Sequence, residues 1–269
     1  MDLQPMISPE KVSATNICPK DNVLYLLRTE NITKSYDSRV IIRDINVHLH
    51  EGELVSLLGL SGSGKTTLFQ VISGLVKPDS GNVFLNEENI TGIPGYISYM
   101  LQKDLLLEHK KVVDNVSLPL VIRGVSKRDA RKQAQPYFEK FGLEGTEEKY
   151  PSQLSGGMRQ RAALLRTYLC SHPAALLDEP FSALDMITKG QMHKWYLDVI
   201  NKIHLSTLLI THDIEEAILL SDRIYIMTGA PGEIHNEIII ERARNERDDF
   251  NLSPEFLDYK KQILDILKQ

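Results

Sequence analysis

The chain has 269 residues, of which 42% are hydrophobic and 25% are charged, an ordinary composition for a globular protein. Its formal net charge of −5 argues against a nucleic-acid partner, because such proteins usually present a basic surface. The only cysteines are Cys18 and Cys170, which argues against a disulfide framework and against a cysteine-rich zinc site. The length suits one large domain, with or without an embedded subdomain.

The first 22 residues contain three prolines and scattered charge, without the basic start and apolar run of a signal peptide. We therefore expect residues 1–22 to form a poorly ordered leader. No stretch of the sequence approaches the roughly 20 apolar residues needed to cross a bilayer. If the protein works at a membrane, other chains must cross it.

Residues 23–58 are typical of strands. Apolar and polar residues alternate over residues 45–50, which is the period of a half-buried strand. His48 and His50 share its polar face, which we interpret as solvated rather than as a metal-binding pair, since no third ligand is near. Residues 54–58 are mostly apolar, as expected for a strand covered on both faces.

A loop rich in glycine and serine follows, and then a predicted helix. Its apolar residues Leu68, Val71, Ile72 and Leu75 fall at helical spacing. Residues 78–81, Pro-Asp-Ser-Gly, predict a turn after this helix.

The stretch from about residue 112 to residue 167 is predicted to be mostly helical. Ser126 can cap a helix, with an aspartate three residues further on. Pro136 lies inside that helix and predicts a kink or a break. One face of the helix is expected to carry Ala130, Ala134, Tyr137 and Phe141.

Strand-like runs return in the last third of the chain, at residues 174–177, 207–210, 224–227 and 237–240. A helical stretch over residues 188–203 separates the first two runs. Strands that alternate with helices predict a parallel sheet with helices on both faces. Beyond this sheet the tail is charged, and Ser253-Pro254 predicts the cap and first turn of a final helix.

Residues 59–66, Gly-Leu-Ser-Gly-Ser-Gly-Lys-Thr, match the Walker A pattern at every position, between a predicted strand and a predicted helix. The glycines allow backbone N–H groups to surround phosphate oxygens, and the helix N-terminus adds partial positive charge. Lys65 is suited to the β- and γ-phosphates and the Thr66 hydroxyl to Mg²⁺. A turn that merely links strand to helix would not require every position. The predicted nucleotide-binding residues here are Gly59, Ser61, Gly62, Ser63, Gly64, Lys65, Thr66 and Thr67.

Two carboxylates, Asp178 and Glu179, end the apolar run 174–177. Such a place is costly for two acids unless a cation compensates them. Asp178 is placed to hold Mg²⁺, and Glu179 to orient and deprotonate an attacking water. The alternative is a helix N-terminus decorated with acids. The phosphate loop earlier in the chain favours the catalytic interpretation.

Residues 154–161, Leu-Ser-Gly-Gly-Met-Arg-Gln-Arg, form a second glycine-rich helix N-terminus, where Ser155 and the amides of Gly156 and Gly157 can bind an anion. An ordinary capped helix would explain the serine and glycines, but not their place upstream of Asp178 in a P-loop protein. The stretch resembles the signature motif of ATP-binding cassette (ABC) ATPases, with methionine where many members have glutamine. The resemblance covers about residues 23–240.

This resemblance implies roles for four further residues. Tyr36 is similar to the aromatic residue that stacks on adenine, although a tyrosine packed within a strand is the competing interpretation. Gln102 corresponds to the glutamine near Mg²⁺ and the attacking water. Asp185 belongs to the segment that touches the opposite subunit. His212 corresponds to the histidine that contacts the γ-phosphate.

The fold that the resemblance implies is α/β: a P-loop NTPase core with a small antiparallel β subdomain and an inserted helical subdomain. The ATPase domain would span residues 23–240, with the helical subdomain at about 104–167. Residues 241–269 would form a charged tail with a final helix.

The function that the resemblance implies is that of an ATP-binding and ATP-hydrolysing subunit of an ABC importer, peripheral at the cytoplasmic face of the cell membrane. ATP and Mg²⁺ would be bound between two copies, the Walker residues of one facing Ser155 to Gly157 of the other. The implied partners are transmembrane permease subunits, a second ATPase subunit in a homodimer and, indirectly, an extracytoplasmic solute-binding protein.

Residues 211–218 and 221–224 resemble those of bacterial importer ATPases. Residues 229–234, together with 179–185, are similar to those of the importer group for nitrate, sulfonate, taurine and pyrimidine precursors. Two stretches depart from that group. Leu107-Glu108-His109 stands where Leu-Pro-Trp is frequent, and Leu165-Arg166-Thr167 where Ala-Arg-Ala is usual. The first departure bears on the identity of the membrane partner.

Two other functions are compatible with the same motifs. One is a non-transport ABC ATPase, which would usually have two cassettes or a long coiled-coil insert. The other is the ATPase of an ABC exporter. A degenerate, nonhydrolysing module is disfavoured by intact Lys65, Asp178, Glu179 and His212. The transported substrate is not readable, because membrane chains and a binding protein select it.

Overall fold

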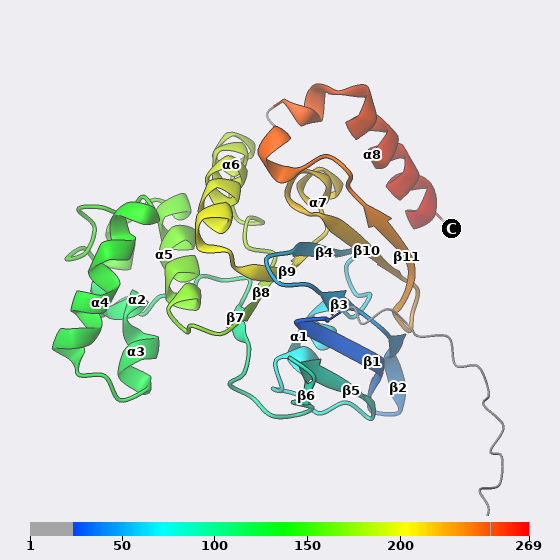
Figure 1. Ribbon diagram of the computed structural model, residues 1–269, viewed down its shortest axis with the longest axis horizontal. Helices are drawn as coiled ribbons and strands as arrows, with labels where there is room; N and C mark the ends of the chain where they lie inside the picture. Colours follow the sequence, from blue (N-terminus) through cyan, green and yellow to red (C-terminus); the bar gives the residue numbers. More distant parts are fainter. Residues whose placement is uncertain (1–23, 248, 269) are drawn as a thin grey trace, which may run out of the picture.

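The computed structural model describes residues 24–247 and 249–268, so the expected leader at residues 1–22 lies outside the described residues. At its centre is a six-stranded sheet in the order β11-β10-β4-β9-β8-β7 (Figure 1). Five of these strands are parallel neighbours, and β11 pairs with β10 in the antiparallel direction. The strands are β4 (Leu54–Gly59), β7 (Ser98–Met100), β8 (Ala174–Asp178), β9 (Ser206–Thr211), β10 (Arg223–Thr228) and β11 (Glu233–Ile239). The predicted runs 54–58, 174–177, 207–210 and 224–227 are confirmed, whereas the run 237–240 is met only in part, since β11 begins at Glu233 and ends at Ile239.

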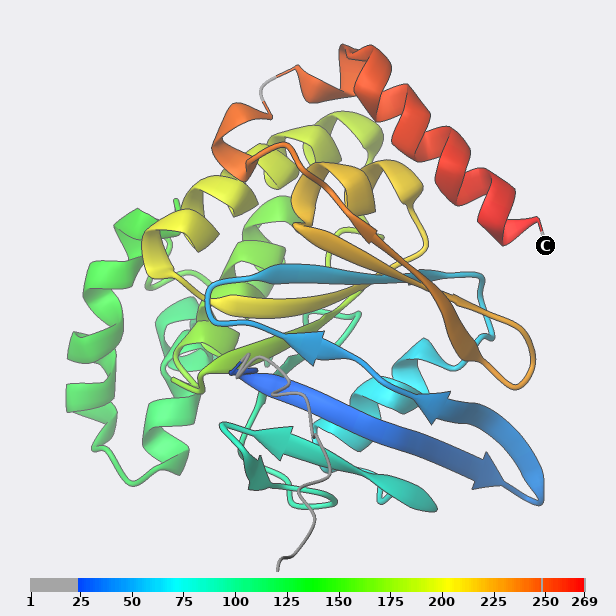
Figure 2. The ribbon, with the colours of Figure 1, turned by 45° about the vertical axis from the view of Figure 1, so that its right-hand side comes forward.

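A second, antiparallel sheet lies beside the first and contains the N-terminal strands (Figure 2). Its strands are β1 (Leu27–Tyr36), β2 (Arg39–Ile45), β3 (His48–Leu49), β5 (Ser80–Leu85) and β6 (Glu88–Asn89). The continuous strand predicted over residues 45–50 is wrong. The chain leaves β2 after Ile45, and the side chain of Asn46 bonds to Asn31 and to the carbonyl of Asp44.

The interpretation of His48 as a solvated residue is also wrong. Its ring lies 4.4 Å from that of Tyr25, and its Nδ1 atom is 2.9 Å from the hydroxyl of Tyr225 on β10. The Nε2 atom accepts a hydrogen bond from Arg223. The alternation correctly predicted a polar face but could not reveal that β10 of the other sheet covers it. His48 therefore joins the two sheets.

Helix α1 (Lys65–Ile72) packs between the two sheets, and Leu68, Phe69 and Val71 are buried among strand residues from both. The helix ends one turn earlier than predicted. Gly74 turns the chain with φ of 76°, and Leu75 lies outside the helix and is 62% exposed. The core between the sheets thus fixes the helix that begins at Lys65.

The predicted helical stretch forms a group of helices beside β7 and β8, at the left of Figure 1. Its members are α2 (Val112–Val116), α3 (Leu118–Ile122), α4 (Lys127–Lys140), a 3-10 turn (Pro151–Gln153) and α5 (Gly156–Tyr168). Ser126 caps α4, as predicted, by accepting from the amide of Asp129. Of the kink or break expected at Pro136, the break is absent, since α4 continues to Lys140.

The exposure of Pro136 explains why α4 tolerates it. The residue lies on the outer side of the helix, as does Lys132, whose carbonyl loses its backbone donor to the proline ring. Water can satisfy that carbonyl. The buried face of α4 carries Ala130 and Ala134 as predicted, but Phe138 is the large buried side chain of the helix, while Tyr137 is only partly buried.

The remaining helices cover the sheet on the side away from α1. They are α6 (Met186–Ile203), α7 (Ile214–Leu220) and α8 (Pro254–Leu267), with 3-10 turns at Arg244–Glu246 and Phe250–Leu252. Ser253 caps α8, as predicted. Phe250, Phe256 and Ile263 pack against Ile218 of α7, so the tail is anchored to the sheet through that helix. Among the described residues, no helix is long and apolar enough to span a bilayer.

Candidate functional site

Three adjacent parallel strands bring the candidate residues to one edge of the main sheet. β4 lies between β10 and β9, and β9 lies between β4 and β8. In that register the ends of β4, β9 and β8 reach Gly59, Thr211 and Asp178 at the same edge. The loops that follow these strands therefore meet, as ligand-binding loops do in open α/β sheets.

The phosphate loop is a closed turn around the ammonium group of Lys65. Lys65 is only 7% exposed, and its Nζ atom donates to the carbonyls of Gly59 and Leu60, both at 2.8 Å. Burial lowers the pKa of this ammonium, against the opposing effect of Glu179 and Asp178. Gly64, the N-cap of α1, has φ of 95°, a conformation that favours glycine.

Gly232, before β11, supports the phosphate loop from outside. Its amide donates to the carbonyl of Ile41, and a Cβ atom placed on it would lie 1.9 Å from the carbonyl oxygen of Ser63. Only a residue without a side chain allows so close an approach. The sequence prediction missed this contact.

Asp178 lies under the phosphate loop. It is 5% exposed, and its Oδ2 atom accepts from the hydroxyls of Thr66 and Tyr99, both at 3.3 Å. Burial raises the pKa of this carboxyl, so a nearby cation would stabilise its charged form. A carboxylate beside a hydroxyl is an oxygen donor set that suits Mg²⁺.

The structure adds Tyr99 to this group. Its pKa lies above the ordinary value, chiefly because of burial and then because of Asp178. The residue precedes Gln102 by three positions and lies within β7, which pairs with β8. The closeness of Tyr99 to Gln102 in the sequence was the only indication that its hydroxyl could reach the carboxylate of Asp178.

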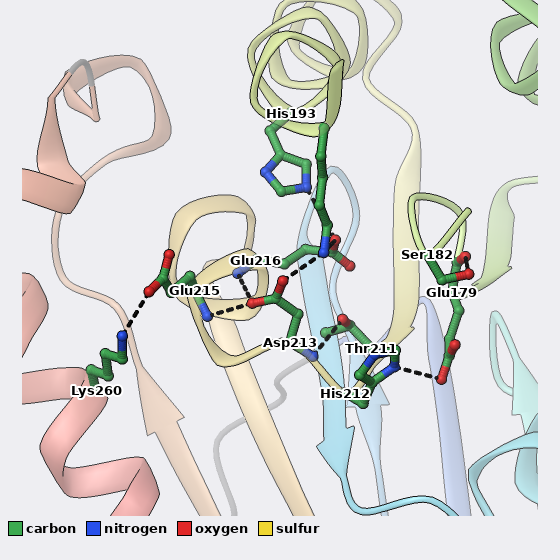
Figure 3. A network of polar contacts seen from close by, with 10 residues as sticks. Glu179, Ser182, His193, Thr211, His212, Asp213, Glu215, Glu216 and Lys260 are labelled. Atoms are coloured by element: carbon green, nitrogen blue, oxygen red, sulfur yellow. Dashed lines mark hydrogen bonds and ion pairs between the residues drawn. The ribbon is translucent and has the colours of Figure 1, made fainter. Parts of the chain in front are cut away.

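Glu179 is held between Gln102 and His212, and Figure 3 shows its contact with His212. Its Oε2 atom accepts from Nε2 of Gln102 at 3.0 Å, and its Oε1 atom lies 3.0 Å from Nδ1 of His212. The backbone of Glu179 has φ of 45°, and its amide donates to the carbonyl of Ile210. The strained backbone turns the carboxylate away from the strand toward these two side chains.

A cavity of about 440 Å³ opens between the phosphate loop and Glu179. It is lined by Ile41, Ser61, Gly62, Gly64, Lys65, Thr66, Thr67, Gln102, Glu179 and His212. Ile41 is the only one of these residues that the sequence prediction did not include. The cavity therefore contains the groups expected to bind a triphosphate and those expected to activate water.

Three predicted site elements lie elsewhere. Tyr36 ends β1, is 42% exposed and has the ammonium of Lys34 at 5.4 Å from its ring centroid. Ser155 caps α5 by accepting from the amide of Met158, with Gly156 and Gly157 in the first turn. Asp185 caps α6. These residues do not line the cavity beside the phosphate loop.

The parallel sheet, the closed phosphate loop and the carboxylate pair at the strand ends define a P-loop ATPase, and the group of helices before a capped Ser-Gly-Gly turn places it in the ATP-binding cassette class. Comparison with known proteins agrees. The sequence pattern described as "ABC transporter" matches residues 42–182, and the chain belongs to that family.

Two relatives illustrate this membership. The formylaminopyrimidine import ATP-binding protein ThiZ of Halalkalibacterium halodurans is 47% identical over 207 residues, 77% of this chain and 81% of that protein. The nitrate import ATP-binding protein NrtD of a Synechocystis strain is 37% identical over 237 residues, 86% of this chain and 89% of that protein.

A solved structure has the same fold. The dimeric cassette MJ0796, in a post-hydrolysis state bound to ADP and phosphate, superposes with a TM-score of 0.69 and is 28% identical. The match covers 81% of this chain and all of that one. The predicted α/β P-loop fold is thus confirmed, and the chain is an ATPase.

Proposed function

We propose that the chain is the ATP-hydrolysing subunit of an ABC importer for a small solute, of the kind that formylaminopyrimidine and nitrate represent. The import roles named for ThiZ and NrtD support the importer and the solute class. The observation that carries the ATPase mechanism is the position of Glu179, held by Gln102 and His212 at the mouth of the phosphate loop.

In this proposal the phosphate loop holds the triphosphate. The amides at the start of α1 face the phosphate oxygens, and Lys65 contributes a buried positive charge. Thr66, Asp178 and Gln102 supply oxygen ligands for Mg²⁺, which would neutralise charge on the phosphates. The raised pKa of Asp178 supports this assignment, because a buried carboxylate gains most from a neighbouring cation.

Glu179 is proposed to orient the attacking water and to accept its proton. His212 and Gln102 keep the carboxylate in place through the two hydrogen bonds described above. His212 also contributes a ring nitrogen that can steady the γ-phosphate. The three side chains line one cavity with Lys65, as this division of roles requires.

The active unit is proposed to be a homodimer. Ser155, Gly156 and Gly157 form a helix N-terminus suited to an anion but do not line the cavity of their own chain, so they would complete the site of a partner. Asp185 would contact that partner, and Tyr36 would stack on the adenine of the nucleotide in its own chain. The dimeric form of the MJ0796 cassette supports this arrangement.

We propose the domain limits given above, with the ATPase domain at 23–240, the helical subdomain at about 104–167 and the tail at 241–269. The helical subdomain and the segment after Gln102 would transmit the ATP cycle to permease subunits. The chain would then work peripherally, at the cytoplasmic face of the membrane, and an extracytoplasmic binding protein would deliver the solute.

The proposal is tested by affinity purification of the tagged chain from gently solubilised native membranes, with mass spectrometry of the co-purifying chains. We expect a protein with several membrane spans, together with a solute-binding protein, and neither from membranes of cells without the tag. Recovery of ribosomal or DNA-associated proteins instead would contradict the transport role while leaving the ATPase chemistry intact.

A further inference from the structure

His212 is followed directly by Asp213, which is the N-cap of helix α7. The Oδ1 atom of Asp213 accepts from the amides of Glu215 at 3.0 Å and Glu216 at 3.2 Å. The amide of Asp213 donates to Oγ1 of Thr211 at 3.0 Å. His212 therefore lies between Thr211 and Asp213, whose positions these hydrogen bonds fix (Figure 3). The direction of the His212 side chain consequently depends on the position of the first turn of α7.

The second carboxylate oxygen of Asp213 is bound by another helix. Nζ of Lys189 lies 2.5 Å from Oδ2 of Asp213 and 3.4 Å from Oε2 of Glu216. Burial by itself would lower the pKa of Lys189, but Asp213 and Glu216 outweigh it, and the pKa is raised. Lys189 is thus a charged link between α6 and the start of α7.

Lys189 belongs to the first turn of α6, which starts at the segment around Asp185. Oδ1 of Asp185 accepts from the amides of Ile187 and Thr188, and the amide of Lys189 donates to the carbonyl of Asp185 at 2.8 Å. A displacement of Asp185 must therefore move the backbone of Lys189. Met186 and Ile187, between them, are 88% and 76% exposed.

Lys189 offsets the negative charge of Glu216 as well as that of Asp213. The carboxylate of Glu216 is 2% exposed and has a second partner, Nε2 of His193 at 3.0 Å, from the next turn of α6. Without Lys189, the carboxylates of Asp213 and Glu216 would face each other with less positive charge between them. The first turn of α7 would then lose its fixed position, whereas loss of His193 would leave the Lys189–Asp213 pair intact.

We propose that Lys189 is a positioning residue for His212, and that the Lys189–Asp213 pair transmits the state of the Asp185 segment to the histidine beside Glu179. Occupation of the Asp185 segment by a partner subunit would thereby affect whether His212 lies against Glu179. The inference rests on the roles proposed above for Glu179 and His212, and it concerns how one of them is held.

The test is steady-state ATPase kinetics of the full-length protein with its permease, for Lys189→Met, Asp213→Asn and, as the matched control, His193→Gln. The asparagine side chain keeps an oxygen to cap α7 but has no charge for Lys189. We expect kcat to fall about 10- to 100-fold in Lys189→Met and Asp213→Asn, as for a misplaced catalytic group, with KM for ATP little changed. Lys189→Arg should recover most of the loss, and His193→Gln should stay within about twofold of wild type.

A double-mutant cycle separates positioning from a merely structural role. In a His212→Ala background, Lys189→Met should cause no further loss of kcat, since no histidine remains to be positioned. An equal loss in both backgrounds would overturn the inference, and so would wild-type kcat in Lys189→Met and Asp213→Asn. Wild-type kcat in His212→Ala alone would instead remove the role proposed for His212, and the inference with it.

Discussion

The Nδ1 atom of His212, after β9, lies 3.0 Å from Oε1 of Glu179, after β8. The two strands are parallel neighbours, with Asp178 opposite Ile210 in the register, so the pairing of the strands sets this distance. The side chains come from loops 33 residues apart in the sequence. The contact between His212 and Glu179 therefore depends on the pairing of β8 with β9 as well as on the two motifs.

Glu179→Gln should keep nucleotide binding and lower ATP turnover by about 10²- to 10⁴-fold, because the amide has the size of the carboxylate but cannot accept a proton from water. Turnover is measured as phosphate release, and binding by calorimetry with a nonhydrolysable ATP analogue. Glu88→Gln, at an exposed position in β6, is the matched control. Wild-type turnover in Glu179→Gln would refute the role as general base.

Lys65→Ala should weaken binding of the same analogue by about 10- to 100-fold, the usual worth of hydrogen bonds to a charged partner. The side chain is buried inside the phosphate loop, where alanine leaves the triphosphate without its cation. Lys77→Ala, an exposed position beyond α1, should bind normally. Equal affinity in the two variants, measured by calorimetry, would contradict the assignment of the loop.

Gly232→Ala should destabilise the phosphate loop, because the new Cβ atom would overlap the carbonyl oxygen of Ser63. We expect a loss of about 1–3 kcal/mol in the free energy of unfolding, together with weaker nucleotide binding. Gly190→Ala is the matched control. There a Cβ atom meets nothing within 4 Å and the position is helical, so stability should rise by about 0.5–1 kcal/mol. The free energy of unfolding of both variants is measured in urea. An unchanged value in Gly232→Ala would show that the phosphate loop can move aside for the new Cβ atom.

Stability should fall in mild acid because of His48. Burial, and then Arg223, lower the pKa of His48 below its ordinary value of 6.5, so the unfolded chain takes up a proton before the folded one does. The stabilisation is complete above the unfolded pKa and is lost as the pH falls toward the folded pKa. Replacing His48 by glutamine should make the urea midpoint less dependent on pH between about 7.5 and 5.5. His235→Gln, an exposed site on β11, should leave the wild-type dependence unchanged, and an identical dependence in all three proteins would exclude His48 as its source.

The sequence alone predicted those parts of the site whose functional residues lie next to one another in one short segment. The phosphate loop and the Asp178-Glu179 pair carry their chemistry in adjacent residues, and strand runs such as 207–210 need only a local period. Gln102 and His212 are single residues, and they were found only through the order of motifs in a family. The structure adds what brings them to the same carboxylate, namely the pairing of β7, β8 and β9.

The contacts that escaped prediction join segments that no local pattern relates. Gly232 supports Ser63 from a distant part of the sequence, and Lys189 reaches Asp213 from a different helix. His48 was placed on the correct face of its strand, but only the packing of the sheets determines what covers that face. Pro136 was misjudged for a related reason, since its cost depends on whether water reaches the carbonyl that it leaves unpaired.

Because Ser155 does not line the cavity of its own chain, the effects of two different substitutions should combine in a specific way. In the proposed homodimer, a chain damaged at Lys65 still offers an intact Ser155, and a chain damaged at Ser155 still offers an intact Lys65. Each variant alone would be inactive at both sites. Mixed, they would assemble one wild-type site per heterodimer, so two inactive preparations would complement each other, and turnover per chain would fall on dilution as the dimer dissociates.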